Sequence, residues 1–231
     1  MLTVILGAGA SYDSDPARRP PPYYCAYYEE RPPLADELFD TRSRFNSILA
    51  KYRPLAAIAT ELRERVSSGE NLESVLANFQ ERDATNQQIP SQLLAARYYL
   101  RDVLDDTSSA WSAQCAGVTT YAAFVNHLNH WSHRTNRIVN YVTFNYDFLL
   151  EDAFANLHTT FDDLTSYVPP LAVGSPNLIR PHGCVRWNQV VNTSAAIPVW
   201  TSDATKIRHA SNLTPVNQFW IGRPERKYSV P

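Results

Sequence analysis

The sequence predicts an α/β fold, because two segments join a strand-like run directly to a helical pattern. Residues 3–11 read Thr-Val-Ile-Leu-Gly-Ala-Gly-Ala-Ser, an apolar and β-branched run that ends in two glycines. Residues 138–143 again have strand character, and helical spacing resumes at Phe148. Both segments are typical of β-turn-α units in a parallel sheet, which binds ligands at the carboxyl ends of its strands.

The composition is that of a soluble protein with a sizeable core. The chain has 231 residues, of which 44% are hydrophobic and 19% charged, enough for one large domain or two small ones. A net charge of −2 gives no basic field that would attract nucleic acid or an anionic membrane. Without a membrane-length apolar run or a signal-peptide pattern, we expect a cytoplasmic protein.

The first candidate site is the turn after the N-terminal strand. It contains only small residues: Gly7, Ala8, Gly9, Ala10 and Ser11. Such a backbone can approach a ligand closely, and a helix after it would direct its N–H groups at the pyrophosphate of a nucleotide. Tyr12 stands in place of the third glycine of Gly-x-Gly-x-x-Gly, so a dehydrogenase-type domain is not favoured. The alternative is an ordinary buried strand that turns on glycines.

A long loop and a series of helices are predicted between the two strands. Residues 13–33 are rich in proline and tyrosine, so we expect a loop that is either a flap over a ligand or a surface insertion. Apolar spacing then predicts helices at 34–39, 43–66 with a break before Pro54, 71–79 with Asn71 as N-cap, 91–104 and 119–133.

Three histidines on the last of these helices were considered as metal ligands. His127, His130 and His133 are three residues apart, whereas a helical ligand pair is usually four apart with an acidic partner. A polar helix face is therefore favoured. Cys25, Cys115 and Cys184 lack Cys-x-x-Cys spacing, so neither a disulfide framework nor a structural zinc site is predicted.

The second candidate site follows the strand at 138–143. Asn145 and Asp147 lie in the turn between this strand and the next helical pattern, where ligands of parallel sheets bind. The amide can donate and accept hydrogen bonds to ribose hydroxyls, while the carboxylate can accept them.

The third candidate is His182, which precedes Gly183 at the end of a short apolar run from residue 177. A lone histidine is usually structural, but three polar clusters at strand ends favour a functional role. Beyond Trp187, residues 197–200 and 219–221 are expected to be short strands. We expect residues 1–231 to be the N-terminal part of a longer protein.

These motifs together resemble the sirtuin family. Gly7 to Ser11, the Thr-Phe-Asn-Tyr-Asp run at 143–147 and His182-Gly183 follow one another in the family's order. The chain is most similar to the sirtuin-like NAD hydrolases of bacterial antiviral defence, and residues 31–39 also look like that branch. The resemblance covers about residues 2 to 187, and its specificity lies in the order of the motifs.

The resemblance implies a Rossmann-like parallel sheet flanked by helices, with a smaller, mainly helical module at about 40–135 inserted after the first strand. It implies that the whole of 1–231 is one sirtuin-like NAD-binding catalytic domain. It also implies that Asn145 orients the reacting ribose and the attacking water, that His182 is the base, and that Asp147 helps to hold the nicotinamide ribose or amide. The small residues from Gly7 to Ser11 would contact NAD.

The departures from the family disfavour peptide deacylation. Deacylases of the family have a four-cysteine zinc module and a glutamine before the motif asparagine, where this chain has three scattered cysteines and Phe144. A late Gly-Thr-Ser-type segment for the adenine ribose is also missing. We therefore expect an NAD glycohydrolase without zinc or any cofactor besides NAD as substrate, controlled by a homo-oligomer or by a sensor or effector domain. The alternatives are a non-catalytic module that senses NAD or ADP-ribose, and an ADP-ribosyltransferase.

Overall fold

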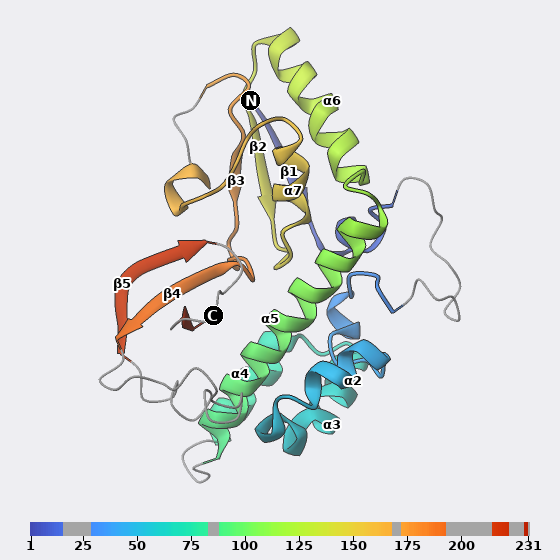
Figure 1. The fold of residues 1–231 in the computed structure, drawn as a ribbon, viewed down its shortest axis with the longest axis vertical. Helices are drawn as coiled ribbons and strands as arrows, with labels where there is room; N and C mark the ends of the chain where they lie inside the picture. The colour runs from blue at the N-terminus through green and yellow to red at the C-terminus, as the bar shows by residue number, and fades with distance from the viewer. Residues whose placement is uncertain (16–28, 83–87, 168–171, 193–213, 222–228, 231) are drawn as a thin grey trace. The chain divides into compact units, whose positions relative to one another are not determined.

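The computed structural model describes residues 1–15, 29–82, 88–167, 172–192, 214–221 and 229–230 (Figure 1). Internal contacts divide the chain into two compact units. We call residues 1–32, 104–187 and 219–223 the sheet unit, and residues 33–103, 188–218 and 224–231 the helical unit. The domain limits expected from the resemblance, 1–231 with a module at 40–135, stay a prediction.

The sheet unit is built on three parallel strands, β1 (Leu2–Leu6), β2 (Val139–Thr143) and β3 (Asn177–Ile179). They lie in the order β1-β2-β3, with Val4 opposite Tyr141 and Tyr141 opposite Leu178. Three helices belong to the same unit, α1 (Ala8–Tyr12), α6 (Thr120–Thr135) and α7 (Leu149–Ala155). The predicted α/β fold with a Rossmann-like parallel sheet and flanking helices is confirmed.

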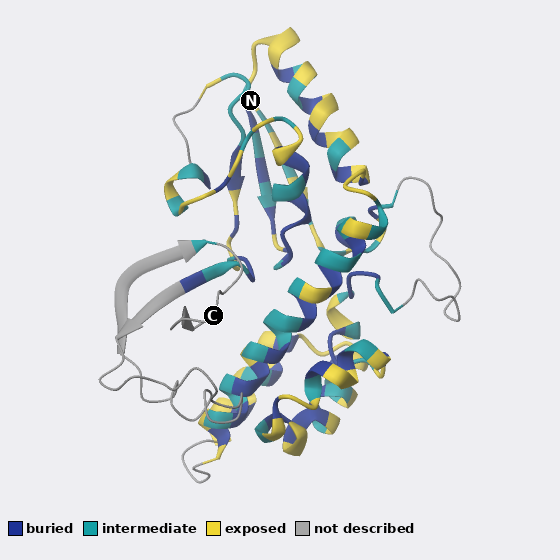
Figure 2. Ribbon diagram, in the orientation of Figure 1, coloured by how far each residue is buried: buried dark blue, intermediate teal, exposed yellow. Residues whose placement is uncertain are grey.

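The core of the sheet unit lies on one face of this sheet. Val4, Tyr141 and Leu178 point to this face, where they pack with Val125 of α6 and Phe154 of α7. Figure 2 shows α6 with buried residues along one side and exposed residues along the other. Thr119 caps α6 by accepting a hydrogen bond from the Ala122 N–H, as its place before the helical pattern suggests.

The opposite face of the sheet carries the alternate residues of each strand. Ile5 of β1 is 69% exposed and Ile179 of β3 is 44% exposed, and both pair with Val142 of β2 in register. Side chains alternate between the faces of a strand, so these three residues form one apolar row across the sheet.

The helical unit contains the 3₁₀ turn η2 (Ala35–Glu37) and the helices α2 (Ser43–Leu49), α3 (Arg53–Ser67) and α4 (Leu72–Glu81). The break between α2 and α3 falls before Pro54, and the Asn71 side chain caps α4, as predicted. The segment 34–39, predicted as a helix, forms only a 3₁₀ turn. The Glu37 carboxylate accepts from the Leu34 N–H at 3.1 Å and also binds Arg42.

The longest helix, α5 (Ile89–Gln114), extends beyond the predicted end at residue 104, and the division between the two units falls within it, after Val103. Thr107 and Ser108 are fully buried in the extension, and both hydroxyls donate to the Leu104 carbonyl. Serine and threonine can lie on the buried side of a helix when their hydroxyl groups donate hydrogen bonds to backbone carbonyls of the same helix. Apolar periodicity therefore could not detect this part of the helix.

A second sheet is formed by β4 (Trp187–Asn192), β5 (Thr214–Ile221) and β6 (Ser229–Val230) in the order β5-β4-β6. The strand predicted at 219–221 falls within β5. The strand predicted at 197–200, Cys25 and most of the loop predicted at 13–33 lie outside the described residues.

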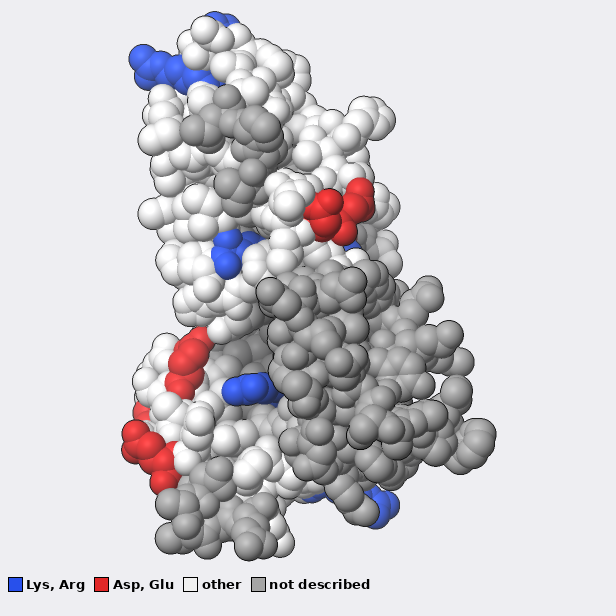
Figure 3. All heavy atoms as spheres, turned by 90° about the vertical axis from the view of Figure 1, so that its left-hand side faces the viewer, with Lys and Arg blue, Asp and Glu red and all other residues white. Residues whose placement is uncertain are grey.

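Several surface properties bear on function. None of the described helices is both long enough and apolar enough to cross a membrane. Within the described ranges no three histidine, cysteine or acidic residues are placed to hold a metal ion, and His127, His130 and His133 are exposed. On the face in Figure 3, basic and acidic side chains form small separate groups.

Candidate functional site

The glycine turn and Asn145 meet at the carboxyl ends of β1 and β2. The Asn145 amide nitrogen donates to the Ser11 hydroxyl at 2.7 Å and to the Tyr121 hydroxyl at 3.2 Å. Ser11 in turn donates to a carboxylate oxygen of Asp147 at 2.6 Å. Three of the predicted site residues, Ser11, Asn145 and Asp147, thus form one hydrogen-bonded cluster.

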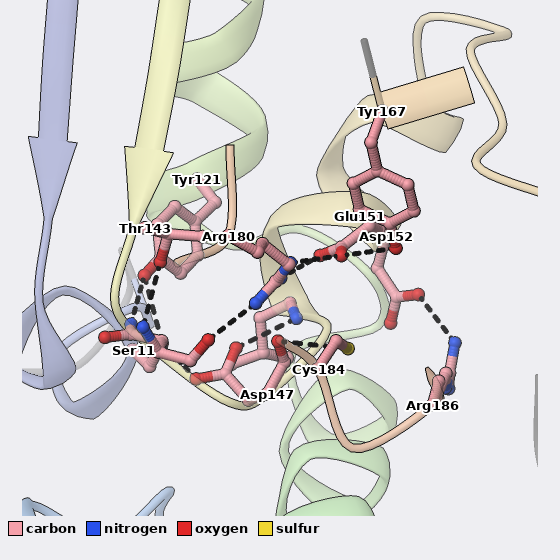
Figure 4. Close-up of polar contacts among 12 residues, drawn as sticks. Ser11, Tyr121, Thr143, Asp147, Glu151, Asp152, Tyr167, Arg180, Cys184 and Arg186 are labelled. Carbon is pink, nitrogen blue, oxygen red and sulfur yellow. Dashed lines mark hydrogen bonds and ion pairs between the residues drawn. The ribbon is translucent and has the colours of Figure 1, made fainter. Parts of the chain in front are cut away.

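Tyr121 completes this cluster from α6 (Figure 4). Its hydroxyl lies 3.0 Å from that of Ser11, and because the single proton of Ser11 goes to Asp147, Tyr121 is the donor between them. Burial, followed by the charge of Asp147, raises the pKa of Tyr121. The phenol therefore stays protonated and can fill this donor role.

Local backbone bonds explain why these residues meet. The Phe144 N–H donates to the Leu6 carbonyl at 3.1 Å, which extends the β1–β2 pairing past the end of β2. The Asn145 N–H then donates to the Thr143 hydroxyl at 3.2 Å. The Asn145 side chain is thereby directed to the buried side, next to Ser11.

Asp147 is engaged entirely within the protein. One carboxylate oxygen accepts from Ser11, and the other accepts from the Leu149 N–H at 3.0 Å, in the first turn of α7. This second bond is an Asx turn that supports the start of the helix. In this structure Asp147 links the glycine turn to α7, whereas its predicted contact with nicotinamide or its ribose stays a prediction.

Burial raises the pKa of Asp147, although the Ser11 hydrogen bond and the Arg180 charge act in the opposite direction. A carboxyl group whose pKa is raised by folding stabilises the protein only while it is protonated, so that contribution is lost as the pH rises through the folded-state pKa.

We therefore expect Asp147→Asn to change the pH dependence of stability. The free energy of unfolding of the wild type should fall relative to the variant as the pH rises from about 4 to 8, by about 1.4 kcal/mol for each unit by which folding raises the pKa. Urea unfolding of both proteins across this range measures the difference. A difference that does not vary with pH would contradict the expected ionisation of Asp147.

A buried ion pair holds the backbone of Asn145. Arg180, which follows β3, donates from one guanidinium nitrogen to the Asn145 carbonyl at 2.6 Å. Its other two nitrogens bind both oxygens of Glu151 in α7 (Figure 4). Burial lowers the pKa of Arg180, but the Glu151 carboxylate and other acidic groups raise it by more, so the guanidinium remains charged. Asn145 is consequently fixed through both its side chain and its carbonyl.

His182 lies on a different side of the 144–146 segment. Its Nδ1 atom is 3.1 Å from the Tyr146 hydroxyl, and its ring packs edge-on against Phe144 with centroids 5.4 Å apart. Phe144 is exposed, Asn145 buried and Tyr146 half-buried, the alternation of an extended chain. His182 is therefore next to the neighbours of Asn145, while the Asn145 amide faces Ser11 and Tyr121.

Two features of the cluster bear on ligand binding, an unused hydrogen-bond acceptor and open space beside the glycines. The Asn145 side-chain oxygen is buried and has no hydrogen-bond partner among the described residues, and Asn145 is 6% exposed overall. A Cβ atom added to Gly7 or Gly9 would meet nothing within 4 Å. Gly7 has an extended backbone, with φ of −120°, so its conformation does not require glycine. Open space beside both glycines is what close approach of a ligand needs.

Some of the residues that shape the site were not predicted. Arg180 stands only two residues before His182, but nothing in the sequence indicates that it contacts Asn145 or Glu151. Tyr121 fits the apolar pattern of α6 like any core residue. Cys184, beside Gly183, is no candidate nucleophile, because burial and the Glu151 charge raise the pKa of its thiol to about 12.

Comparison with known protein families matches residues 139–210 to the SIR2-like domain. This match covers about a third of the chain, which is similar to the SIR2-like domain over these residues. The match begins with β2 and contains Asn145, Asp147 and His182, while the glycine turn precedes it. None of the curated proteins matches the chain. The match supports the resemblance to the sirtuin family over these residues and is consistent with an NAD-related function, whereas the antiviral branch and the lack of a zinc module stay predictions.

Proposed function

We propose that this SIR2-like protein is an NAD glycohydrolase that releases nicotinamide and ADP-ribose and so depletes NAD in antiviral defence. The supporting observation is the Asn145 side chain, held at the end of β2 by Ser11 of the glycine turn, with its oxygen unpartnered among the described residues. That oxygen can accept a hydrogen bond from a ribose hydroxyl or from a water molecule.

The reaction needs few protein groups. When the bond between the nicotinamide nitrogen and the ribose carbon breaks, its electron pair passes to nicotinamide and positive charge develops on the sugar. Water attacks this carbon and loses a proton to a base. In our proposal Asn145 positions the ribose and the water, and His182 is the base, with Tyr146 orienting its ring.

A second function is favoured by the position of His182. Its ring contacts Phe144 and Tyr146, on a different side of the segment from the Asn145 amide. A protein in which the two groups stay apart would bind NAD or ADP-ribose without cleaving the glycosidic bond. The alternative is therefore a sensing module whose output is a conformational or assembly change.

Control by a partner is part of the proposal. We propose a cytoplasmic enzyme that needs no zinc and that a homo-oligomer, or a sensor or effector domain, holds inactive until it is triggered. If the isolated chain binds NAD without cleaving it, adding the controlling domain, or forming the oligomer, should restore NAD cleavage.

The decisive experiment incubates the full-length, activated protein with NAD and follows nicotinamide by chromatography. Release of nicotinamide together with free ADP-ribose supports hydrolysis, and label on protein or nucleic acid would instead identify ADP-ribosyl transfer. We expect His182→Ala to lower the rate about a hundredfold or more, because general-base catalysis contributes that much. Saturable NAD binding without any product would favour the sensing module, and unchanged turnover in His182→Ala would remove His182 from the mechanism.

Gly9→Val separates a ligand-binding role of the glycine turn from a structural one. An added Cβ meets nothing at this position, so the variant should keep the thermal unfolding midpoint of the wild type within a few degrees. NAD affinity should nevertheless fall at least about tenfold if the nucleotide lies against the turn. Calorimetric titration with NAD measures this, with Gly9→Ala as the smaller matched substitution. Normal NAD affinity in Gly9→Val would exclude close contact at Gly9.

A further inference from the structure

A cavity of about 210 Å³ lies beside the first half of β2, away from the end that carries Asn145. Its walls come from α6, β2, α7 with the residues that follow it up to Thr159, and residues 174–176, all within the sheet unit. Tyr141 and Asn145 are four residues apart on an extended chain, so about 13 Å of strand separates the cavity from the candidate NAD site.

Tyr141 contributes a hydroxyl group to this cavity from the middle of β2. Tyr141 lines the cavity and is only 2% exposed. Its ring packs edge-on against Phe154 with centroids 4.9 Å apart, yet within the described part of the chain the hydroxyl has no hydrogen-bond partner. Buried tyrosine hydroxyls usually have one. Burial raises the pKa of this phenol, so it remains a donor.

The other lining residues define the kind of ligand. Apolar side chains come from Leu128, Val139 and Phe154, but most of the accessible lining is polar. The polar groups come from Asn129, Ser132, His133, Thr159 and Ser175 in addition to Tyr141. No acidic residue, lysine or arginine is among the described residues that line the cavity, so a charged ligand would find no counter-ion. A cavity of about 150 Å³ can hold benzene, so by volume this one has room for a ring that carries a polar substituent.

The wall near His133 is closely packed. A Cβ atom added to Gly174, which has φ of +82°, would lie 2.5 Å from the His133 ring. The Gly174 N–H faces the Ser132 hydroxyl at 3.4 Å. The segment around Gly174 thus lies directly against α6 and closes this side of the cavity.

We propose that this cavity is a second small-molecule site, which takes a neutral, single-ring molecule with a carbonyl or similar acceptor for the Tyr141 hydroxyl. The site is independent of the proposed NAD hydrolysis. It uses the opposite end of β2, and none of its lining residues belongs to the cluster of Ser11, Asn145 and Asp147.

Acetophenone tests the proposal, because it is neutral, has one ring and carries a carbonyl. We expect ligand-detected NMR to show saturable binding to the full chain, and ethylbenzene, which has the same shape without the acceptor, to bind at least about tenfold more weakly. The affinity of Tyr141→Phe for acetophenone should also fall at least about tenfold. The phenylalanine ring can still pack on Phe154 in this variant. Asn145→Ala, in the candidate NAD site, should bind acetophenone like the wild type.

A cavity-filling variant provides an independent check. Asn129→Trp should block acetophenone binding, whereas Asn126→Trp, which lies one turn earlier on α6 and does not line the cavity, should not. Circular dichroism confirms that each variant is folded. The proposal is overturned by non-saturable binding to the wild type, by equal binding to wild type and Tyr141→Phe, or by loss of binding in Asn145→Ala.

Discussion

Asn145→Ala is expected to lower nicotinamide release from NAD by about a hundredfold or more. Loss of one positioned hydrogen-bonding group in an active site typically costs two to three orders of magnitude in rate. Here the lost group is an amide held by Ser11 and Tyr121, whose oxygen has no hydrogen-bond partner among the described residues. Initial rates at saturating NAD, for wild type and variant at equal concentrations of folded protein, measure the effect.

The same substitution also weakens the fold, so a control is needed. Removing the amide takes away its hydrogen bonds to Ser11 and Tyr121, although Tyr121 still donates to Ser11. The loss of a buried hydrogen-bond partner costs about 1–3 kcal/mol. Tyr121→Phe disturbs the same cluster but keeps Asn145, and we expect its rate to fall less than about tenfold. Equal rate losses in the two variants would show that the cluster matters only for stability.

The strands and most helices could be predicted because their patterns are local. The glycine turn follows an apolar run, Asn71 precedes a helical stripe, and Asn145 follows a strand. The carboxyl ends of neighbouring parallel strands share one edge of the sheet, which is why Ser11 and Asn145 were expected to meet. Their hydrogen bond at 2.7 Å agrees with that expectation.

Contacts between distant segments could not be predicted in the same way. The side to which His182 turns depends on how the chain leaves β3, and its contacts with Phe144 and Tyr146 leave no trace in the local sequence. Asp147 accepts from the Leu149 N–H in an Asx turn. Local sequence cannot distinguish a carboxylate in such a turn from one that faces a ligand, and the predicted ligand contact of Asp147 stays a prediction. Buried polar groups of this kind are decided by the three-dimensional arrangement.

The largest effect on stability is expected from Arg180→Met, which removes the guanidinium that binds Glu151 and the Asn145 carbonyl. The Arg180 side chain is fully buried and that of Glu151 is 10% exposed. Breaking a buried ion pair by removing one partner costs about 3–5 kcal/mol, because the other charge is left without compensation. Urea unfolding followed by tryptophan fluorescence, together with hydrogen exchange of the β2 amides, measures this loss.

Two further variants distinguish the cost of leaving the Glu151 charge uncompensated from the cost of losing the arginine side chain. Arg137→Met changes an exposed arginine just before β2 and should alter the free energy of unfolding by less than about 0.5 kcal/mol. The double variant Arg180→Met/Glu151→Met removes both charges, and replacing a buried ion pair by apolar residues is often nearly neutral. We therefore expect it to be more stable than Arg180→Met alone. If the double variant were no more stable than Arg180→Met, the uncompensated Glu151 charge would not be the cause of the loss. The hydrogen bond from Arg180 to the Asn145 carbonyl would then be its main contribution.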